Sequence, residues 1–419
     1  MEATRIRLAE GVHLTYLPAR KFKTSLLSAQ FVTPLRRETA GANALLAAVL
    51  RRGTVSCPDM GALSAKMDNL YDASIDYTVR KKGENQCVGF VASFIDDRYA
   101  PGGERLLEPA AALLGELICD PVTYHGRFVP EYFESEKTNL LEAIRSLIND
   151  KRDWADSRLL RALCDGEAYA VPRLGDEETV DKLQALKVYT QYRDLISTAP
   201  LEIIYSGSAE LERVKQALAA AFATLPREEV RVISTAAPHV CRESVQHVED
   251  VLDVTQGKLG MGFSCGSDDM PALLMGNTLF GGSSNSKLFL NVREKLSLCY
   301  YASSLYHRQK GLITVSSGIE FQNYQRAYDE IMAQLEAVQK GELEDWELEG
   351  ARSTLLNNYA TVGDSQGKLE NFYLGQAATG QHETPADLAR AIQDMTAERI
   401  CRAMSTVKLD TVYFLKGKE

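Results

Sequence analysis

The sequence predicts an α+β fold made of two homologous halves, and three observations lead to this prediction. The chain has 419 residues, which is long enough for two or three domains. Residues 226–247 contain prolines and mixed charges between a helical run and a strand, so this segment is the best candidate linker. The stretches on either side, 1–225 and 248–419, show the same order of expected elements, which indicates an internal repeat.

Each half is expected to open with a strand and a helix. Leu26–Thr33 and Lys258–Cys265 have the apolar pattern of strands. The helices expected after them cover Gly41–Leu50 and Met270–Phe280, and glycines follow both. The opening unit of the first half therefore recurs in the second.

Two strands joined by a basic turn come next in each half. They are Ala73–Arg80 and Gln86–Phe94 in the first half, and Tyr300–His307 and Leu312–Ile319 in the second. The remaining matched elements are helices at 104–117 and 324–338, long helices around 136–142 and 351–357, helices at 188–195 and 397–404, and strands at 201–206 and 411–415. Two such halves can close on each other like a clamshell, with a chamber for a ligand between them. An extended peptide suits this chamber, because an exposed sheet edge accepts it as an added strand.

Charge and composition exclude several classes of protein. Lys and Arg total 47 against 57 Asp and Glu, a net charge of −10, so we expect neither a nucleic acid nor a membrane as partner. No apolar run approaches the roughly 18 residues of a spanning helix, and the first residues do not resemble a signal peptide, which predicts a cytoplasmic protein. The eight cysteines form no CxxC pair, so neither a thiolate zinc site nor a disulfide scaffold is expected.

One short motif is compatible with an alternative function, that of a serine hydrolase. Residues 262–266 fit the GxSxG pattern around Ser264, and His307 or His382 are candidate bases. The repeat disfavours this reading, because it places the motif inside the strand equivalent to Ala29–Val32.

Several segments spread over nearly the whole chain carry a resemblance to a known family. They are the helix ending in Arg52-Gly53-Thr54, the run Asn139–Glu142, Phe280-Gly281-Gly282, and the run Val292–Tyr300. Together with the strand pairs, these segments resemble the M16 family of metallopeptidases, which includes insulinase and the mitochondrial processing peptidase. Within this family the chain is most similar to the bacterial type associated with modification of elongation factor P. The resemblance implies an M16-like clamshell of two α/β halves.

The resemblance also implies that the zinc site of the active members is degenerate here. Active members carry HxxEH on the first helix, with two His as zinc ligands and a Glu as general base. Counted back from the helix end, these positions hold Ala44, Ala47 and Ala48, whose methyl groups cannot coordinate a metal. Glu142 matches the third ligand, although an exposed or salt-bridged helix Glu explains it equally well and one carboxylate cannot hold zinc. We therefore expect no cofactor in this chain and no peptidase activity from it alone.

Two residues of the second half still match the pattern of the active family members. The resemblance implies that Arg293 and Tyr300 hold the substrate backbone and stabilise the oxyanion of the tetrahedral intermediate, a role that suits a guanidinium and a phenol. The loop at Gly281 and Gly282 ends a helix and is expected to lie against a peptide backbone. The sequence thus predicts a non-catalytic subunit that forms a heterodimer with a zinc-bearing HxxEH homologue and acts in trans on an unfolded or extended peptide. The alternative is a peptide-binding or scaffolding homologue with no peptidase role.

Overall fold

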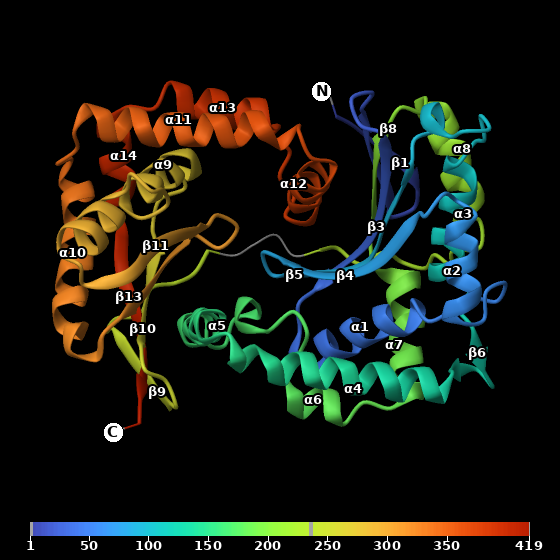
Figure 1. Ribbon diagram of the computed structural model, residues 1–419, viewed down its shortest axis with the longest axis horizontal. Helices are drawn as coiled ribbons and strands as arrows, with labels where there is room; N and C mark the ends of the chain where they lie inside the picture. Colours follow the sequence, from blue (N-terminus) through green and yellow to red (C-terminus); the bar gives the residue numbers. More distant parts are fainter. Residues whose placement is uncertain (1–2, 234–237, 419) are drawn as a thin grey trace. The chain divides into compact units, whose positions relative to one another are not determined.

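A computed structural model describes residues 3–233 and 238–418. The described chain forms two compact units, each with one main sheet and its own helices (Figure 1). The first unit comprises residues 3–145, 171–233 and 363–382, and the second comprises 146–170, 238–362 and 383–418. The predicted α+β class with two similar halves is confirmed.

The sheet of the first unit has six strands in the order β1-β2-β8-β3-β5-β4. Their bounds are β1 Thr4–Ala9, β2 Val12–Pro18, β8 Leu201–Gly207, β3 Thr24–Pro34, β5 Asn85–Ile95 and β4 Ser74–Lys82. Strand β3 is buried on both faces, and its successive side chains alternate between an apolar face and a polar face. Leu27 and Ala29 point into the apolar core, whereas Ser28 and Gln30 lie on the other face and form hydrogen bonds there. Strand β4 lies at one edge of this sheet and pairs only with β5 among the described strands.

Helix α1, Arg37–Leu50, is the most deeply packed helix on this sheet, because every residue from Ala40 to Leu50 is buried. The other elements of the unit are α2 Met60–Asp68, α3 Leu107–Cys119, α4 Pro130–Ser146, α6 Glu177–Asp181, α7 Ala185–Thr198, α8 Leu211–Ala221, α12 Gln366–Ala378 and the short strands β6 Thr123–Tyr124 and β7 Arg127–Phe128. Small alanine side chains let α1 lie close to its neighbours. The removal of its apolar surface from water stabilises the unit.

The sheet of the second unit has five strands in the order β11-β12-β10-β13-β9. Their bounds are β11 Cys299–His307, β12 Leu312–Ile319, β10 Gly257–Cys265, β13 Val407–Gly417 and β9 Gln246–Leu252. The helices are α5 Lys151–Leu163, α9 Met270–Phe280, α10 Tyr324–Lys340, α11 Asp345–Val362, α13 Pro385–Gln393 and α14 Ala397–Met404. Helix α9 begins where the Asp269 side chain accepts a hydrogen bond from the Ala272 N–H, and it ends at Gly281.

The compact units differ from the contiguous division 1–225 and 248–419 in two helices. Helix α5 packs on the sheet of the second unit, where Leu159 lies in a buried cluster with Tyr413 and Arg158 pairs with Asp250 at 2.8 Å. Helix α12 belongs to the first unit, although it comes late in the sequence. The physical reason is that an amphipathic helix covers whichever sheet face its connections reach, regardless of its place in the chain. Of the expected linker 226–247, residues 234–237 lie outside the described residues.

None of the helices in residues 3–233 and 238–418 combines the length and the apolar character that crossing a membrane requires.

An ion pair between α3 and α8 predicts a pH dependence of stability. Arg213 donates hydrogen bonds of 2.8 and 2.6 Å to Glu108, which lowers the pKa of this carboxyl from 4.5 to about 2. A lowered pKa stabilises the fold above the unfolded value, so this contribution is lost as the pH falls from 4.5 towards 2. Because the Glu108 side chain is 41% exposed, solvent screening leaves about 1 kcal/mol.

The corresponding measurement is urea unfolding of the unmodified protein and of Glu108→Gln between pH 6 and pH 3. We expect Glu108→Gln to be less stable by about 1 kcal/mol at pH 6, with a difference that shrinks as the pH falls below 4.5. A difference that stays constant over this range would show that the carboxylate contributes nothing through its charge.

Candidate functional site

A hollow of about 710 Å³ lies in the first unit beside the positions expected to have lost the zinc ligands. Ala44 and Ala48 of α1 form part of its wall, so the structure brings two of the three alanines to one surface. Ala47 is 1% exposed and packs in the apolar core instead. The rest of the wall consists of Tyr77, Thr78, Val79, Arg80, Lys81 and Lys82 of β4, Glu136, Asn139, Leu140 and Ala143 of α4, and Arg173, Leu174 and Asn371.

The face of α4 that lines this hollow does not include Glu142. Glu136, Leu140 and Ala143 lie on one side of the helix, because residues three and four apart share a face. Glu142 is exposed and lies outside the hollow, since one residue turns a helix by about 100°. The structure therefore places Ala143, rather than Glu142, on the face of α4 that lines the hollow with Ala44 and Ala48.

The one carboxylate among the described residues that line the hollow is already paired. Glu136 accepts a hydrogen bond of 2.9 Å from Arg52 and another of 3.2 Å from the amide of Asn139. No imidazole or thiol belongs to the described residues that line the hollow. This set of side chains does not fit a zinc ion, because the described wall offers a single carboxylate and neither an imidazole nor a thiol to complete the ligands.

Positive charge dominates the wall of the hollow. Arg80, Lys81, Lys82 and Arg173 line it, and burial lowers the pKa of Lys82, which donates to the side chain of Asn371 at 2.6 Å. These cations repel a divalent metal and attract carboxylates. Sequence reasoning missed this lining; the only signal for it was the basic turn after the first of the paired strands.

Strand β4 gives the hollow an open sheet edge. It has one partner strand among the described residues, and its segment from Tyr77 to Lys82 lies along the hollow. Arg173 donates a hydrogen bond of 3.1 Å to the Val79 carbonyl, which keeps this loop against the strand. Edge strands of this kind accept an extended peptide through backbone hydrogen bonds.

In the second unit the structure brings Arg293 and Tyr300 together. The Nε–H of Arg293 donates to the Tyr300 carbonyl oxygen at 3.1 Å, and the guanidinium lies 4.7 Å from the centre of the Phe289 ring. Tyr300 is 62% exposed and lies at the start of β11, an edge strand with a bulge between Cys299 and Tyr301. A bulge at an edge re-aims the side chain that it carries. The phenol of Tyr300 is thus available to a ligand, while Arg293 is held beside it.

Internal packing accounts for Gly281 and Gly282. The Gly281 carbonyl accepts a hydrogen bond of 2.9 Å from the Ser304 N–H, and a Cβ on Gly281 would lie 2.8 Å from that nitrogen. A Cβ on Gly282 would lie 2.9 Å from the side-chain nitrogen of Asn277. Their role towards a peptide backbone stays a prediction.

The serine hydrolase alternative is wrong. Ser264 is 5% exposed and lies inside β10, paired with Leu312 and Lys408 on the two neighbouring strands. A Cβ on Gly262 would lie 2.7 Å from Leu163, so this glycine admits α5 rather than forming a sharp turn. A nucleophile elbow needs an exposed serine between a strand and a helix.

Known proteins share this fold and sequence over almost the whole chain. Residues 182–355 match the family described as Peptidase M16 inactive domain. A Bacillus subtilis protein named probable inactive metalloprotease YmfF is 34% identical, with 98% of this chain and 96% of the relative covered. A conserved protein from Enterococcus faecalis superposes with a TM-score of 0.88 at 26% identity, with 99% of both chains covered.

A peptidase M16 inactive domain from Pseudomonas fluorescens shares the fold, with a TM-score of 0.80 at 18% identity and coverage of 100% of this chain and 99% of that chain. These names say nothing about elongation factor P, so that part of the resemblance stays a prediction. The word inactive in these names is consistent with the alanines on α1 and with a hollow whose lining does not fit zinc. The chain therefore belongs to the M16 peptidase family, as an inactive metalloprotease-like member of it.

Proposed function

We propose that this chain is the non-catalytic subunit of a two-chain peptidase, in which a zinc-bearing HxxEH homologue supplies the metal. The observation that carries the proposal is the contact between Arg293 and the exposed Tyr300 on an open sheet edge. A chain that lacks the catalytic zinc site of the active members has no evident use for this pair unless a second chain brings the metal. The chain thus provides substrate-binding and oxyanion-stabilising groups in trans.

The chemistry of the two side chains fits this role. A zinc ion in the partner chain would supply an activated water, and attack of this water on a peptide carbonyl would place negative charge on the carbonyl oxygen. The phenol of Tyr300 donates a hydrogen bond to that oxygen, and the guanidinium of Arg293 adds positive charge. The Nε–H of Arg293 donates to the Tyr300 carbonyl oxygen, and Nη1 lies 3.2 Å from a carboxylate oxygen of the exposed Glu294. These contacts hold the guanidinium beside Tyr300.

The substrate class in this proposal is an unfolded or extended peptide. Strand β4 offers an open edge for such a peptide, and the hollow beside it is large enough for several side chains. The cations Lys82 and Arg173 favour acidic side chains there.

The cytoplasm is the proposed location. All eight cysteines lie in the described residues, and none of them forms a disulfide. Reduced thiols are typical of cytoplasmic proteins.

Association with the homologue is the first test of this proposal. We expect this chain and a zinc-bearing M16 homologue from the same organism to co-elute as one complex in sizing chromatography, at low and at moderate salt. A peptidase chamber shared by two chains should bury at least about 1,000 Å². Elution as separate species under both salt conditions would contradict the heterodimer and leave the peptide-binding homologue as the better description.

A further inference from the structure

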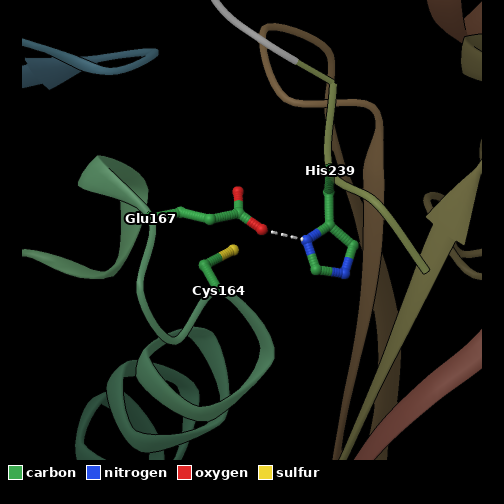
Figure 2. A group of neighbouring side chains, drawn as sticks. All are labelled: Cys164, Glu167 and His239. Carbon is green, nitrogen blue, oxygen red and sulfur yellow. Dashed lines mark hydrogen bonds and ion pairs between the residues drawn. The ribbon is translucent and has the colours of Figure 1, made fainter. Parts of the chain in front are cut away.

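Three side chains in the second unit place different metal-binding atoms close together. Figure 2 shows Cys164 at the end of α5, Glu167 three residues later, and His239 on the segment that precedes β9. Their donor atoms, the thiol sulfur, a carboxylate oxygen and an imidazole nitrogen, all lie within 4.8 Å of one another. Cys164 is fully buried and the His239 side chain is 3% exposed, whereas Glu167 is 26% exposed. The cluster is therefore shielded, with an approach from solvent on the side of Glu167.

The surroundings of His239 orient its ring as in metal centres. Nε2 lies 3.2 Å from Asp410 Oδ2, and Nδ1 lies 2.5 Å from Glu167 Oε1. Asp410 is itself fixed, because the backbone and guanidinium of Arg242 donate to it at 2.8 and 2.7 Å. Imidazoles that bind metals usually donate their second N–H to a carboxylate in this way. Nδ1 then points at the other two donors of the cluster.

We propose that Cys164, Glu167 and His239 bind a divalent transition-metal ion of the zinc class. A thiolate together with an imidazole and a carboxylate is a donor set that zinc prefers over magnesium or calcium. Three protein ligands leave the fourth position of a tetrahedral site to water. The ion would join the end of α5 to the segment that leads into β9.

The charges of the cluster permit such an ion. Glu167 and Asp410 are balanced by Lys310, whose ammonium lies 2.5 Å from Glu167 Oε2, and by Arg242. Metal binding would require a thiolate on Cys164 and an Nδ1 without its proton on His239, so protons are released as the ion enters.

This site is separate from the degenerate one at Ala44 and Ala48, and it does not depend on the proposed function. A metal ion at this site would depart from the expectation that the chain contains no cofactor. That expectation rests on the alanines of α1 and on the spacing of the cysteines along the sequence. The spacing gave no sign of it, because 72 positions separate Glu167 from His239.

The test is metal binding by the full-length chain after treatment with a chelator and dialysis. We expect about one zinc ion per chain by elemental analysis after zinc is added back, and a blue cobalt derivative with a thiolate charge-transfer band. Cys164→Ala and His239→Gln should each weaken zinc binding by at least about 100-fold. Added zinc should raise the Tm of the unmodified chain.

The matched control is Cys87→Ala, which removes another fully buried thiol that lies in the first unit. This variant should bind zinc and gain thermal stability from it like the unmodified chain, whereas Cys164→Ala should show no gain in Tm. The proposal is overturned if the unmodified chain retains no zinc, or if Cys164→Ala retains as much as Cys87→Ala. Neither outcome bears on pairing with a homologue.

Discussion

Tyr300→Phe and Arg293→Ala are each expected to lower the kcat of the assembled peptidase about 10²- to 10³-fold, the usual cost of a lost oxyanion donor. Phe removes only the hydroxyl of Tyr300, so the packing of β11 should survive. Arg293→Ala also removes a contact that holds the start of this strand, so KM is expected to rise as well. Assembly with the homologue should be unchanged in both variants. Steady-state kinetics on an unstructured peptide, with sizing chromatography of each pair, measures both quantities.

A matched control is Tyr124→Phe, which removes the hydroxyl of another exposed tyrosine, 52% exposed and remote in sequence from β11. It should leave kcat unchanged. If Tyr300→Phe and Arg293→Ala assemble normally and turn over peptide within about threefold of the unmodified pair, far from a lost oxyanion donor, the trans-acting role is wrong.

Glu370→Ala is expected to destabilise the first unit by about 3 kcal/mol, the cost of removing one partner of a buried ion pair. Glu370 lies on α12 and is 4% exposed on its side chain. It accepts two hydrogen bonds from Arg80, at 2.6 and 2.7 Å, and a third from Ser28 at 2.7 Å. The variant would leave the guanidinium of Arg80 without its carboxylate against the sheet. Unfolding in urea, followed by circular dichroism, measures the loss.

The same stretch of chain offers a control in Asp364→Ala. Asp364 pairs with Lys21 at 2.7 Å, but both side chains are about half exposed or more, at 67% and 47%. Exposed pairs contribute little, so we expect a change below about 0.5 kcal/mol. Equal losses in Glu370→Ala and Asp364→Ala would contradict the idea that the buried pair fixes α12 on this sheet.

Much of the fold follows from local patterns. The strand expected at 26–33 is the centre of β3, and the helix expected at 41–50 is the body of α1, because apolar spacing reports directly on burial. The placement of α5 and α12 could not be predicted in this way. An amphipathic helix records that one side is buried, but its sequence does not say which sheet covers that side.

The candidate sites likewise contain some residues that local sequence patterns predict and others that only tertiary contacts bring together. Ala44 and Ala48 were located from the end of their helix, since a helix fixes the spacing of its own residues. The match of Glu142 to the third ligand stays a prediction: a shift of one residue moves a side chain to another face of a helix, and Ala143 is the residue that lines the hollow. The cluster of Cys164, Glu167 and His239 arises from tertiary contacts alone. No rule about the spacing of cysteines and histidines along the sequence identifies this cluster.

The central claim is that this chain completes a peptidase only together with a zinc-bearing homologue. The most direct measurement is the turnover of one unstructured peptide by each chain alone and by their equimolar mixture. We predict no turnover by this chain alone, and turnover by the mixture at least about 100-fold above that of the homologue alone, matching the contribution of an oxyanion donor. Equal turnover by the homologue with and without this chain would contradict the claim.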